Sequence, residues 1–318
     1  MRAMFRFVTA AILAAAAAQA AAQALRVVVP GPPGGFADIA VRLASDRLQQ
    51  ALGGPVVIEH KPGAGGTVGL EYLRNQKPDG GAVAMINLSA TANETLVKGK
   101  SWSLLSDFEP VGQYAWLANV LIVNPSVPGD SLRALVEGLK AKGGATSYAS
   151  GGVGSPAHLV TELFRGRSGL ALTHVPYKGA PPAVTSVVAG ETAFMFATAS
   201  SAIGQVRGGK VKALAVTTAE RLAQLPEVPT LAQAGYTDMN VTDWAGLVAP
   251  RGTPPEARAR IHRAFAGAFA DAEAGRRLRE ATILPLPAAA DGAAFGAFLR
   301  AEVDKWAQVI RDAGITPN

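Results

Sequence analysis

Short apolar runs alternate with helix-length segments along the first part of the chain. Residues 25–29, 56–58 and 82–86 are short and apolar, as is typical of buried strands. A stripe of apolar positions at helical spacing separates the first two runs, formed by Ile39, Leu43, Ala44, Leu48 and Leu52. Residues 67–75 predict a second helix before the third run. Helices between short apolar strands predict βαβ units and a parallel sheet.

The same alternation returns in the second part of the chain. Further strands are predicted at residues 146–149, 171–175, 193–197 and 213–217. Helices are predicted between and before them, over residues 132–139, 155–165 and 181–189. The last part is helical, with apolar stripes from Ile261 to Phe269 and from Phe295 to Ile310. The whole pattern predicts an α/β protein with two separate sheets.

Two extended stretches, residues 114–124 and 243–250, lack the helix that should interrupt them. We interpret them as crossings between two lobes. The first lobe then comprises residues 25–123 plus 247–318, and the second comprises residues 124–246.

Residues 1–24 have the pattern of a secretory signal peptide. Arg2 and Arg6 precede an apolar run over residues 8–18, and two A-x-A patterns follow, ending at Ala20 and Ala24. The apolar run is too short to span a bilayer comfortably, which favours a cleaved signal over a membrane anchor. Either A-x-A pattern suits signal peptidase, so both cleavage sites stay open.

Composition excludes several classes of site. The chain has no cysteine, which rules out disulfides, thiolate metal sites and a lipid anchor on an N-terminal cysteine. Without Arg2 and Arg6, 28 basic residues face 24 acidic ones, a net charge of +4. This mild excess suits an anionic small ligand. The basic residues are scattered, and we therefore expect no nucleic-acid partner.

Glycine-rich turns follow four of the predicted strands and precede helices. They lie at residues 31–38, 63–67, 150–155 and 177–179. Ligands of open α/β sheets bind beyond the carboxyl ends of the strands, where helix N-termini present unpaired N–H groups. Glycine lets the backbone approach a ligand closely. Four such turns predict a cleft lined by amides and hydroxyls, which suits a carboxylate, although any single turn is equally explained by tight strand-to-helix packing.

Catalytic and metal-binding patterns are poor. The chain has no G-x-S-x-G elbow and only four histidines. His158 and Glu162 lie one helical turn apart, and only His174 is available as a third metal ligand. We expect His158 to pack in the first turn of its helix instead. No cofactor, metal or enzymatic activity is predicted.

The turns also carry a resemblance to a known family. The motifs Val29-Pro-Gly-Pro-Pro-Gly-Gly-Phe-Ala-Asp38, Glu59-His-Lys-Pro-Gly-Ala-Gly-Gly-Thr67, Ser150-Gly-Gly-Val-Gly-Ser-Pro-Ala-His158 and Val175-Pro-Tyr-Lys-Gly179 resemble its four ligand loops. Residues 225–230 and 244–250 continue the match. The chain thus resembles the substrate-binding receptors of tripartite tricarboxylate transporters, also called the Bug family.

The resemblance implies a type II-like periplasmic binding protein fold, with two α/β lobes, two crossover segments and a ligand cleft between the lobes. It further implies a periplasmic monomer, not a lipoprotein, that captures a small organic acid for the membrane permease of such a transporter. Carboxylates would be held by amides, small hydroxyls and water, without an arginine clamp. The ligand-binding residues expected from the turns and the resemblance together are Gly34, Gly35, Phe36, Ala37, Gly66, Ser89, Ser150, Gly151, Gly154, Ser155, His158, Tyr177, Lys178, Gly179, Thr198 and Asp243.

Two other functions compete with a transport receptor. An orphan sensor would present the same solute to a signalling protein, and a metal-assisted hydrolase or lyase could use the same fold. The first loop departs from the family by its Pro32-Pro33 pair and by the bulky Phe36. These departures bear on which carboxylate is bound.

Overall fold

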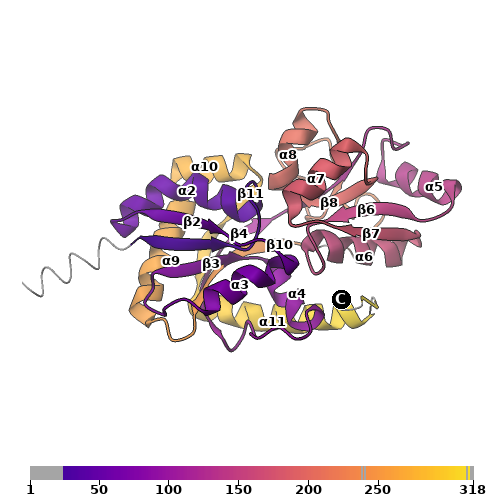
Figure 1. Cartoon of the computed structure of the whole chain (residues 1–318). Coiled ribbons are helices and arrows are strands. Elements are labelled where there is room, and N and C mark those ends of the chain that lie inside the picture. The colour runs from indigo at the N-terminus through magenta and orange to yellow at the C-terminus, as the bar shows by residue number, and fades with distance from the viewer. Residues whose placement is uncertain (1–23, 238, 240, 313, 316–318) are drawn as a thin grey trace, which may run out of the picture.

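Two separate sheets form the framework of the protein (Figure 1). The computed structural model describes residues 24–237, 239, 241–312 and 314–315. The predicted signal peptide lies outside these residues except for its last position, Ala24. Among the described residues, no helix is long and apolar enough to cross a membrane.

The first sheet has six strands in the order β11-β4-β10-β3-β1-β2. Its strands are β1 (Leu25–Val29), β2 (Val56–His60), β3 (Ala82–Ile86), β4 (Phe108–Leu117), β10 (Asp243–Pro250) and β11 (Ile283–Asp291). β1, β2 and β3 run parallel, and β10 is antiparallel to β3 and β4. The helical segments of this lobe are α2 (Phe36–Leu52), η1 (Ala64–Gly66), α3 (Thr67–Arg74), α4 (Leu88–Leu96), α9 (Pro255–Ala270), α10 (Ala272–Glu280) and α11 (Gly292–Asp312).

The second sheet has five strands in the order β7-β6-β8-β5-β9. Its strands are β5 (Asn119–Val123), β6 (Thr146–Ser150), β7 (Leu172–Pro176), β8 (Phe194–Thr198) and β9 (Lys212–Val216). Its helices are α5 (Leu132–Lys142), α6 (Pro156–Ser168), α7 (Ala180–Ala189) and α8 (Ala199–Arg207). β6, β7 and β8 are parallel, and the crossing strand β5 is antiparallel to β8, as β10 is to β3 in the first sheet.

Strand pairing moves both predicted lobe boundaries. The sequence predicts residues 119–123 in the first lobe, but β5 pairs with β8 and β9 of the second sheet. Likewise, residues 243–246 are predicted in the second lobe, whereas all of β10 pairs within the first sheet. The first crossing therefore lies at Ala118, whose carbonyl already accepts a hydrogen bond from Ala199 of the second lobe at 2.8 Å. Extended apolar residues suit either sheet, so hydropathy alone could not place these boundaries.

Helices α4 and α8 were not predicted from the apolar pattern. Almost all of α4 is buried, including Thr91 and Asn93, so it lacks the polar face that marks an amphipathic helix. α8 follows β8 without a connecting loop and begins with small residues, Ala199 and Ser200. Both helices begin directly at the carboxyl end of a buried strand.

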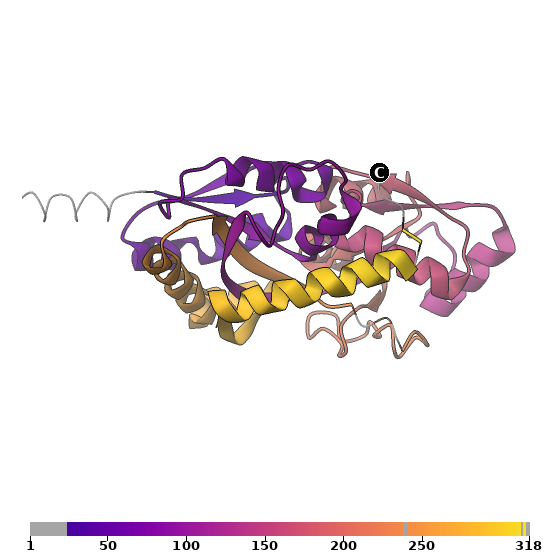
Figure 2. The ribbon, with the colours of Figure 1, turned by 90° about the horizontal axis from the view of Figure 1, so that it is seen from below.

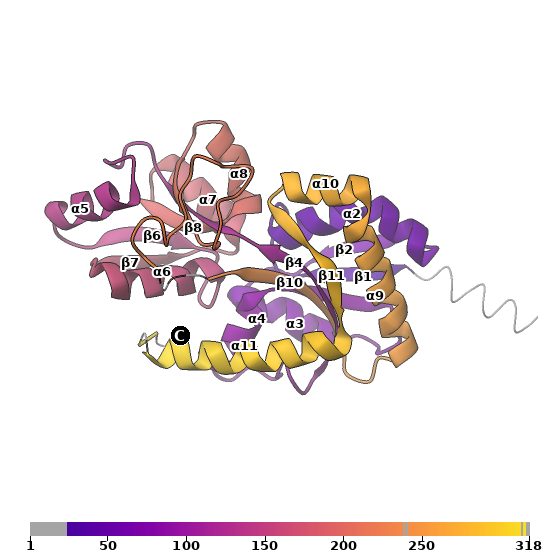
Figure 3. The ribbon, with the colours of Figure 1, turned by 180° about the vertical axis from the view of Figure 1, so that it is seen from behind.

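An apolar core joins the lobes on one side of the molecule. A single cluster of buried side chains includes Trp244 and Trp306 from the first lobe and Phe164 from the second. α11 runs along this side beneath both lobes (Figures 2 and 3). Buried Glu302 of α11 accepts hydrogen bonds from the indole N–H groups of Trp244 at 3.2 Å and Trp306 at 3.1 Å. The last helix is thereby tied to the crossing strand β10.

Gly246 of β10 offers a test of this packing. A Cβ atom at Gly246 would overlap the ring of buried Phe295 on α11. We expect Gly246→Ala to lower the free energy of unfolding by about 1–3 kcal/mol, because overpacked cores shift side chains and backbone. Gly267 of α9 is the matched control, since an added Cβ meets no atom within 4 Å there. Gly267→Ala should raise stability by about 0.5–1 kcal/mol. Urea denaturation of both variants measures these effects, and equal stabilities would contradict the predicted overlap.

Candidate functional site

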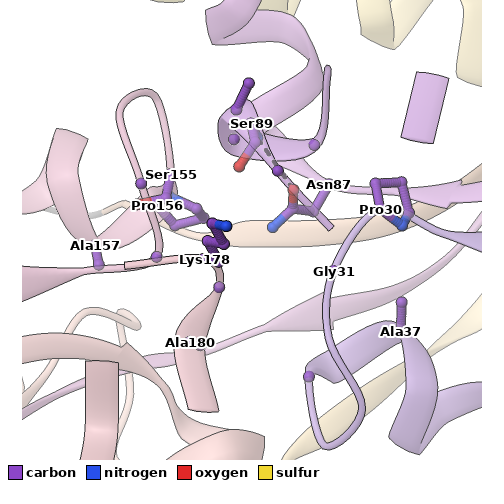
Figure 4. Close-up of a pocket in the computed structure, with 18 of the residues that line it drawn as sticks. Pro30, Gly31, Ala37, Asn87, Ser89, Ser155, Pro156, Ala157, Lys178 and Ala180 are labelled. Carbon is purple, nitrogen blue, oxygen red and sulfur yellow. Dashed lines mark hydrogen bonds between the residues drawn. The ribbon is translucent and has the colours of Figure 1, made fainter. Parts of the chain in front are cut away.

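A cavity of about 450 Å³ lies between the lobes. Its wall comes from the connections after β1, β2 and β3 in the first lobe and after β6, β7 and β8 in the second. Figure 4 shows Ser155, Pro156 and Lys178 of the second lobe facing Asn87, Ser89 and the segment Pro30–Gly31 of the first. All six parallel strands therefore direct their carboxyl ends at one space, as the parallel-sheet prediction requires.

Helix N-termini converge on this cavity. Its wall contains the residues that precede six helices: Gly35 for α2, Gly66 for α3, Asn87 for α4, Ser155 for α6, Gly179 for α7 and Thr198 for α8. Each N-terminus carries unpaired N–H groups and a partial positive charge. The backbone at these helix N-termini therefore favours an anion in the cavity, without any contribution from charged side chains.

Four of these N-termini have no side-chain cap, although Pro181 and Pro182 of α7 have no N–H and the Ala199 N–H of α8 donates to the carbonyl of Ala118. In the described structure, no side chain caps α2, α3, α7 or α8. Gly66 and Gly179 precede two of these helices at φ angles of 97° and 107°, which side-chain-bearing residues rarely adopt. α4 and α6 differ, because Asn87 accepts from Ser89 N–H at 3.2 Å and Ser155 accepts from His158 N–H at 3.3 Å. Glycine replaces the usual capping residues where the site needs free donors.

The glycine turns of the two lobes touch each other across the cavity. A Cβ atom on Gly179 would overlap Pro32, one on Gly65 would overlap the carbonyl of Val153, and one on Gly154 would overlap Asn93. The hydroxyl of Ser201 on α8 also donates to the carbonyl of Gly34 at 3.3 Å. The structure therefore has the two lobes closed on the cavity, with glycines at the points of closest approach.

Asp38 holds the first turn in place. Its carboxylate accepts hydrogen bonds from the N–H of Gly34 and from the side chains of Arg42 and His60, each at 2.9 Å. Burial alone would raise the pKa of Asp38, but these three donors lower it below its usual value. Asp38 is thus an ionised support of the loop that lies outside the cavity wall.

Aromatic and polar side chains form a buried stack beneath the third turn. The rings of His158 and His174 are parallel with centroids 4.3 Å apart, and Tyr148 stacks on the other face of His174 at 4.9 Å. Nδ1 of His158 accepts from Gly154 N–H at 3.2 Å, and Nε2 of His174 lies 2.6 Å from Ser150 Oγ. The stack positions the turn without lining the cavity.

The same stack explains why His158, Glu162 and His174 do not form a metal site. The imidazoles lie face to face, and the ring nitrogens already contact Gly154 and Ser150. Glu162 accepts from the Tyr148 hydroxyl at 2.6 Å and pairs with Arg165. In the part of the chain that the structure describes, no group of three His, Cys, Asp or Glu side chains is arranged to hold a metal ion.

Asp243 is buried beside the cavity and does not reach its wall. Its carboxylate accepts from the N–H groups of Leu88 at 3.0 Å and Trp244 at 2.8 Å, and from Nδ2 of Asn87 at 3.0 Å. Burial raises the pKa of Asp243 to about 7 despite these donors. Asp243 was expected to contact the ligand; in the structure its carboxylate orients Asn87 and the start of α4.

Most of the residues expected at the site lie on the cavity wall. They are Gly35, Phe36, Ala37, Gly66, Ser89, Gly151, Ser155, Tyr177, Lys178, Gly179 and Thr198. The structure places Gly34, Ser150, Gly154, His158 and Asp243 behind the wall, where they support the turns. Sequence reasoning missed Asn87 on the wall. A capping residue directly after the apolar run 82–86 was the signal that could have identified it.

Known proteins resemble the chain over nearly its whole length. Residues 40–315 match the family described as "Tripartite tricarboxylate transporter family receptor". BugT of Bordetella pertussis (strain Tohama I) is 32% identical over 295 residues, which cover 92% of this chain and 90% of BugT. The structure of the periplasmic binding protein BugD is 28% identical with a TM-score of 0.89, covering 93% of this chain and 99% of BugD. Rpa4515 of R. palustris with adipate is 29% identical with a TM-score of 0.88, covering 92% and 98% of the two chains.

The histidine stack makes a prediction about pH. Burial lowers the pKa of both His158 and His174 to about 4, assisted by Arg165 at the first ring and by His158 at the second. Histidine in an unfolded chain takes up its proton near pH 6.5, so the contribution of this pair to stability is complete above that pH. That contribution is lost as the pH falls towards 4. We expect the imidazole NMR signals of both residues, assigned with single His→Gln variants, to titrate near pH 4. Titration of either ring above pH 6 would contradict the buried stack.

Proposed function

This chain belongs to the family of tripartite tricarboxylate transporter receptors, and we propose that it captures a small organic carboxylate in the periplasm for the permease of such a transporter. The family consists of solute-binding receptors, and the protein is accordingly a binding protein and not an enzyme. The observation that carries the proposal is the convergence of uncapped helix N-termini on one cavity.

A carboxylate suits these N-termini better than a neutral or cationic solute. Its oxygens can accept several hydrogen bonds, and hydrogen bonds to a charged group are stronger than those between neutral groups. Among the described residues of the wall, none is Asp, Glu, His or Arg. An anion therefore meets no repelling carboxylate, and substrate chemistry would lack an acid–base pair of carboxylates or histidines. The adipate bound to Rpa4515, a structural relative, supports the same ligand class.

Lys178 is the one basic side chain on the described part of the wall, and it is exposed. A hydrated ammonium at the rim attracts anions over a distance without clamping them. We infer that Lys178 steers the ligand to the cleft and that the backbone amides hold it. The holding groups would then be provided by helices of both lobes, so binding favours the closed form.

Periplasmic location and a permease partner complete the proposal. The signal-peptide pattern of residues 1–24 supports export, and the relative BugD is a periplasmic binding protein. A permease partner follows from the family, whose receptors serve tripartite transporters.

The proposal is tested by comparing acids with their neutral amides. Malate, adipate, butyrate and hexanoate should be titrated calorimetrically, each against the corresponding amide. We expect at least one acid to bind and its amide to bind about tenfold or more weakly, because the amide loses charge-assisted hydrogen bonds. Binding of amides with the same affinity as their acids would contradict an anion site.

Lys178→Ala separates steering from clamping. We expect several-fold slower association and a weaker dependence of the association rate on salt, with the dissociation rate nearly unchanged. Lys142→Ala is the matched control, because Lys142 is an exposed lysine at the end of α5 and does not line the cavity. Stopped-flow binding at two salt concentrations measures both rates. Much faster dissociation, equivalent to about 2–5 kcal/mol, would mean that Lys178 pairs directly with the carboxylate.

A further inference from the structure

The buried carboxylate of Asp243 already occupies the anion position at the start of α4. It accepts hydrogen bonds from the N–H of Leu88, the first residue of the helix, and from Nδ2 of Asn87, both at 3.0 Å. The next two N–H groups are also paired, because Ser89 N–H donates to Asn87 Oδ1 at 3.2 Å and Ala90 N–H donates to the Asn87 carbonyl at 2.9 Å. The first turn of α4 therefore has a negative charge beside it and no free backbone donor for a second anion.

Two side-chain groups remain available on the cavity wall at this point. Asn87 and Ser89 both line the cavity (Figure 4). An amide nitrogen carries two N–H groups, and Nδ2 of Asn87 uses one of them for Asp243. Only 9% of Ser89 is exposed, and its hydroxyl has no hydrogen-bond partner among the described residues. The second N–H of Asn87 and the hydroxyl of Ser89 are thus the polar groups that the start of α4 offers to a ligand.

The two partners of the Asn87 amide fix its orientation. As an ionised carboxylate, Asp243 can only accept a hydrogen bond, and the backbone N–H of Ser89 can only donate one. A flipped amide would place oxygen against the carboxylate and nitrogen against the N–H, so neither bond could form. Figure 4 shows the amide nitrogen on the side of Asn87 that faces Lys178 of the second lobe. The group that Asn87 presents to the cavity is therefore an N–H donor.

These two groups suit a neutral oxygen better than a second carboxylate. A ligand hydroxyl can accept from Asn87 and donate to Ser89, and a carbonyl oxygen can accept from both. A carboxylate at the same place would be separated from the charge of Asp243 by the Asn87 amide alone, and like charges close together in a poorly solvated site repel each other. Asp243 lies behind the wall, so this repulsion acts on groups bound at Asn87. The carboxylate of the ligand then binds elsewhere on the wall.

We propose that Asn87 and Ser89 form a subsite for a hydroxyl or carbonyl oxygen of the ligand, and that Asp243 is the positioning residue that orients Asn87 and excludes a second carboxylate from this subsite. The preferred ligand is then a carboxylate that also carries a hydroxyl or oxo group. This inference rests on the proposed function, because it presupposes that the cavity binds a carboxylate.

Derivatives of butyrate locate the neutral oxygen. Butyrate is compared with 2-, 3- and 4-hydroxybutyrate, which differ from it by one hydroxyl at successive carbons. We expect one of the three to bind about tenfold tighter than butyrate, because its hydroxyl pairs two polar groups of the wall that butyrate leaves unpaired. Isothermal titration calorimetry with the full mature chain measures the affinities. The pH is set to 8, because burial raises the pKa of Asp243 to about 7.

Ser89→Ala and Asn87→Ser remove the two groups of the subsite one at a time. Ser89→Ala deletes only the hydroxyl, and Asn87→Ser keeps a capping side chain at the start of α4. Each variant should lose most of the preference for the hydroxy acid over butyrate, whereas a general structural defect would weaken both ligands alike and leave their ratio unchanged. Ser45→Ala is the matched control and should keep the full preference, since Ser45 lies within α2 and does not line the cavity.

Asp243→Asn tests the positioning residue. At the carbon where the hydroxyl binds best, a carboxylate in place of the hydroxyl gives ethylmalonate, methylsuccinate or glutarate. We expect the wild-type protein to bind that dicarboxylate about tenfold more weakly than the hydroxy acid, because of the charge of Asp243. Asp243→Asn keeps the shape of the side chain and removes this charge, so the ratio of the two affinities should narrow several-fold. Asp46→Asn, at an exposed aspartate of α2, is the control and should leave the ratio unchanged.

The outcomes separate this inference from the function beneath it. If no hydroxybutyrate binds more than about threefold tighter than butyrate, or if the preference survives in either Ser89→Ala or Asn87→Ser, the subsite is overturned and carboxylate binding stands. A dicarboxylate that binds the wild-type protein as tightly as the hydroxy acid, or a ratio that Asp243→Asn leaves unchanged, overturns the role of Asp243. If none of these acids binds, and malate, adipate and hexanoate do not bind either, the proposed function itself fails.

Discussion

Unpaired N–H groups at helix N-termini are the constraint on which this structure depends. A helix start is normally closed by its own side chain or by water. Here six helix starts meet at one cavity, and four of them lack a side-chain cap. Their donors are available to a ligand that both lobes enclose. The cost to stability is local and small, since glycine in place of a capping side chain typically forfeits only roughly a few tenths of a kcal/mol per helix.

The fold delivers these helix starts in a fixed arrangement. Both sheets place three parallel strands beside one antiparallel crossing strand, so the parallel strands of both lobes end at the shared cavity. The common apolar cluster and the contacts of Glu302 with Trp244 and Trp306 hold α11 against β10. Rigid lobes and short glycine turns then bring the backbone of one lobe within van der Waals reach of the other. Larger residues at Gly154 or Gly179 would separate them.

Titratable side chains support the turns of the site without lining the cavity. Asp38 holds the first turn, Asp243 orients Asn87, and the stacked His158 and His174 support the third turn. Keeping these groups behind the wall leaves a cavity whose field comes from backbone dipoles and one exposed lysine. Such a field attracts an anion, and no carboxylate of the described wall repels it.

Local chemistry sufficed to predict much of this protein. Short apolar runs and stripes of period 3.6 located most strands and helices, and glycine turns between them located four of the six connections at the cavity, since both signals arise from neighbours in the chain. The other two connections, at Asn87 and Thr198, contain no glycine turn and begin the largely buried helix α4 and the helix α8, neither of which was predicted from the apolar pattern. Which of Ser150, His158 and Asp243 would line the cavity and which would support it depended on side-chain direction. The lobe boundaries at Ala118 and Asp243 depended on which sheet each crossing strand pairs with. Those outcomes were decided only by the tertiary structure, because they result from contacts between residues far apart in sequence.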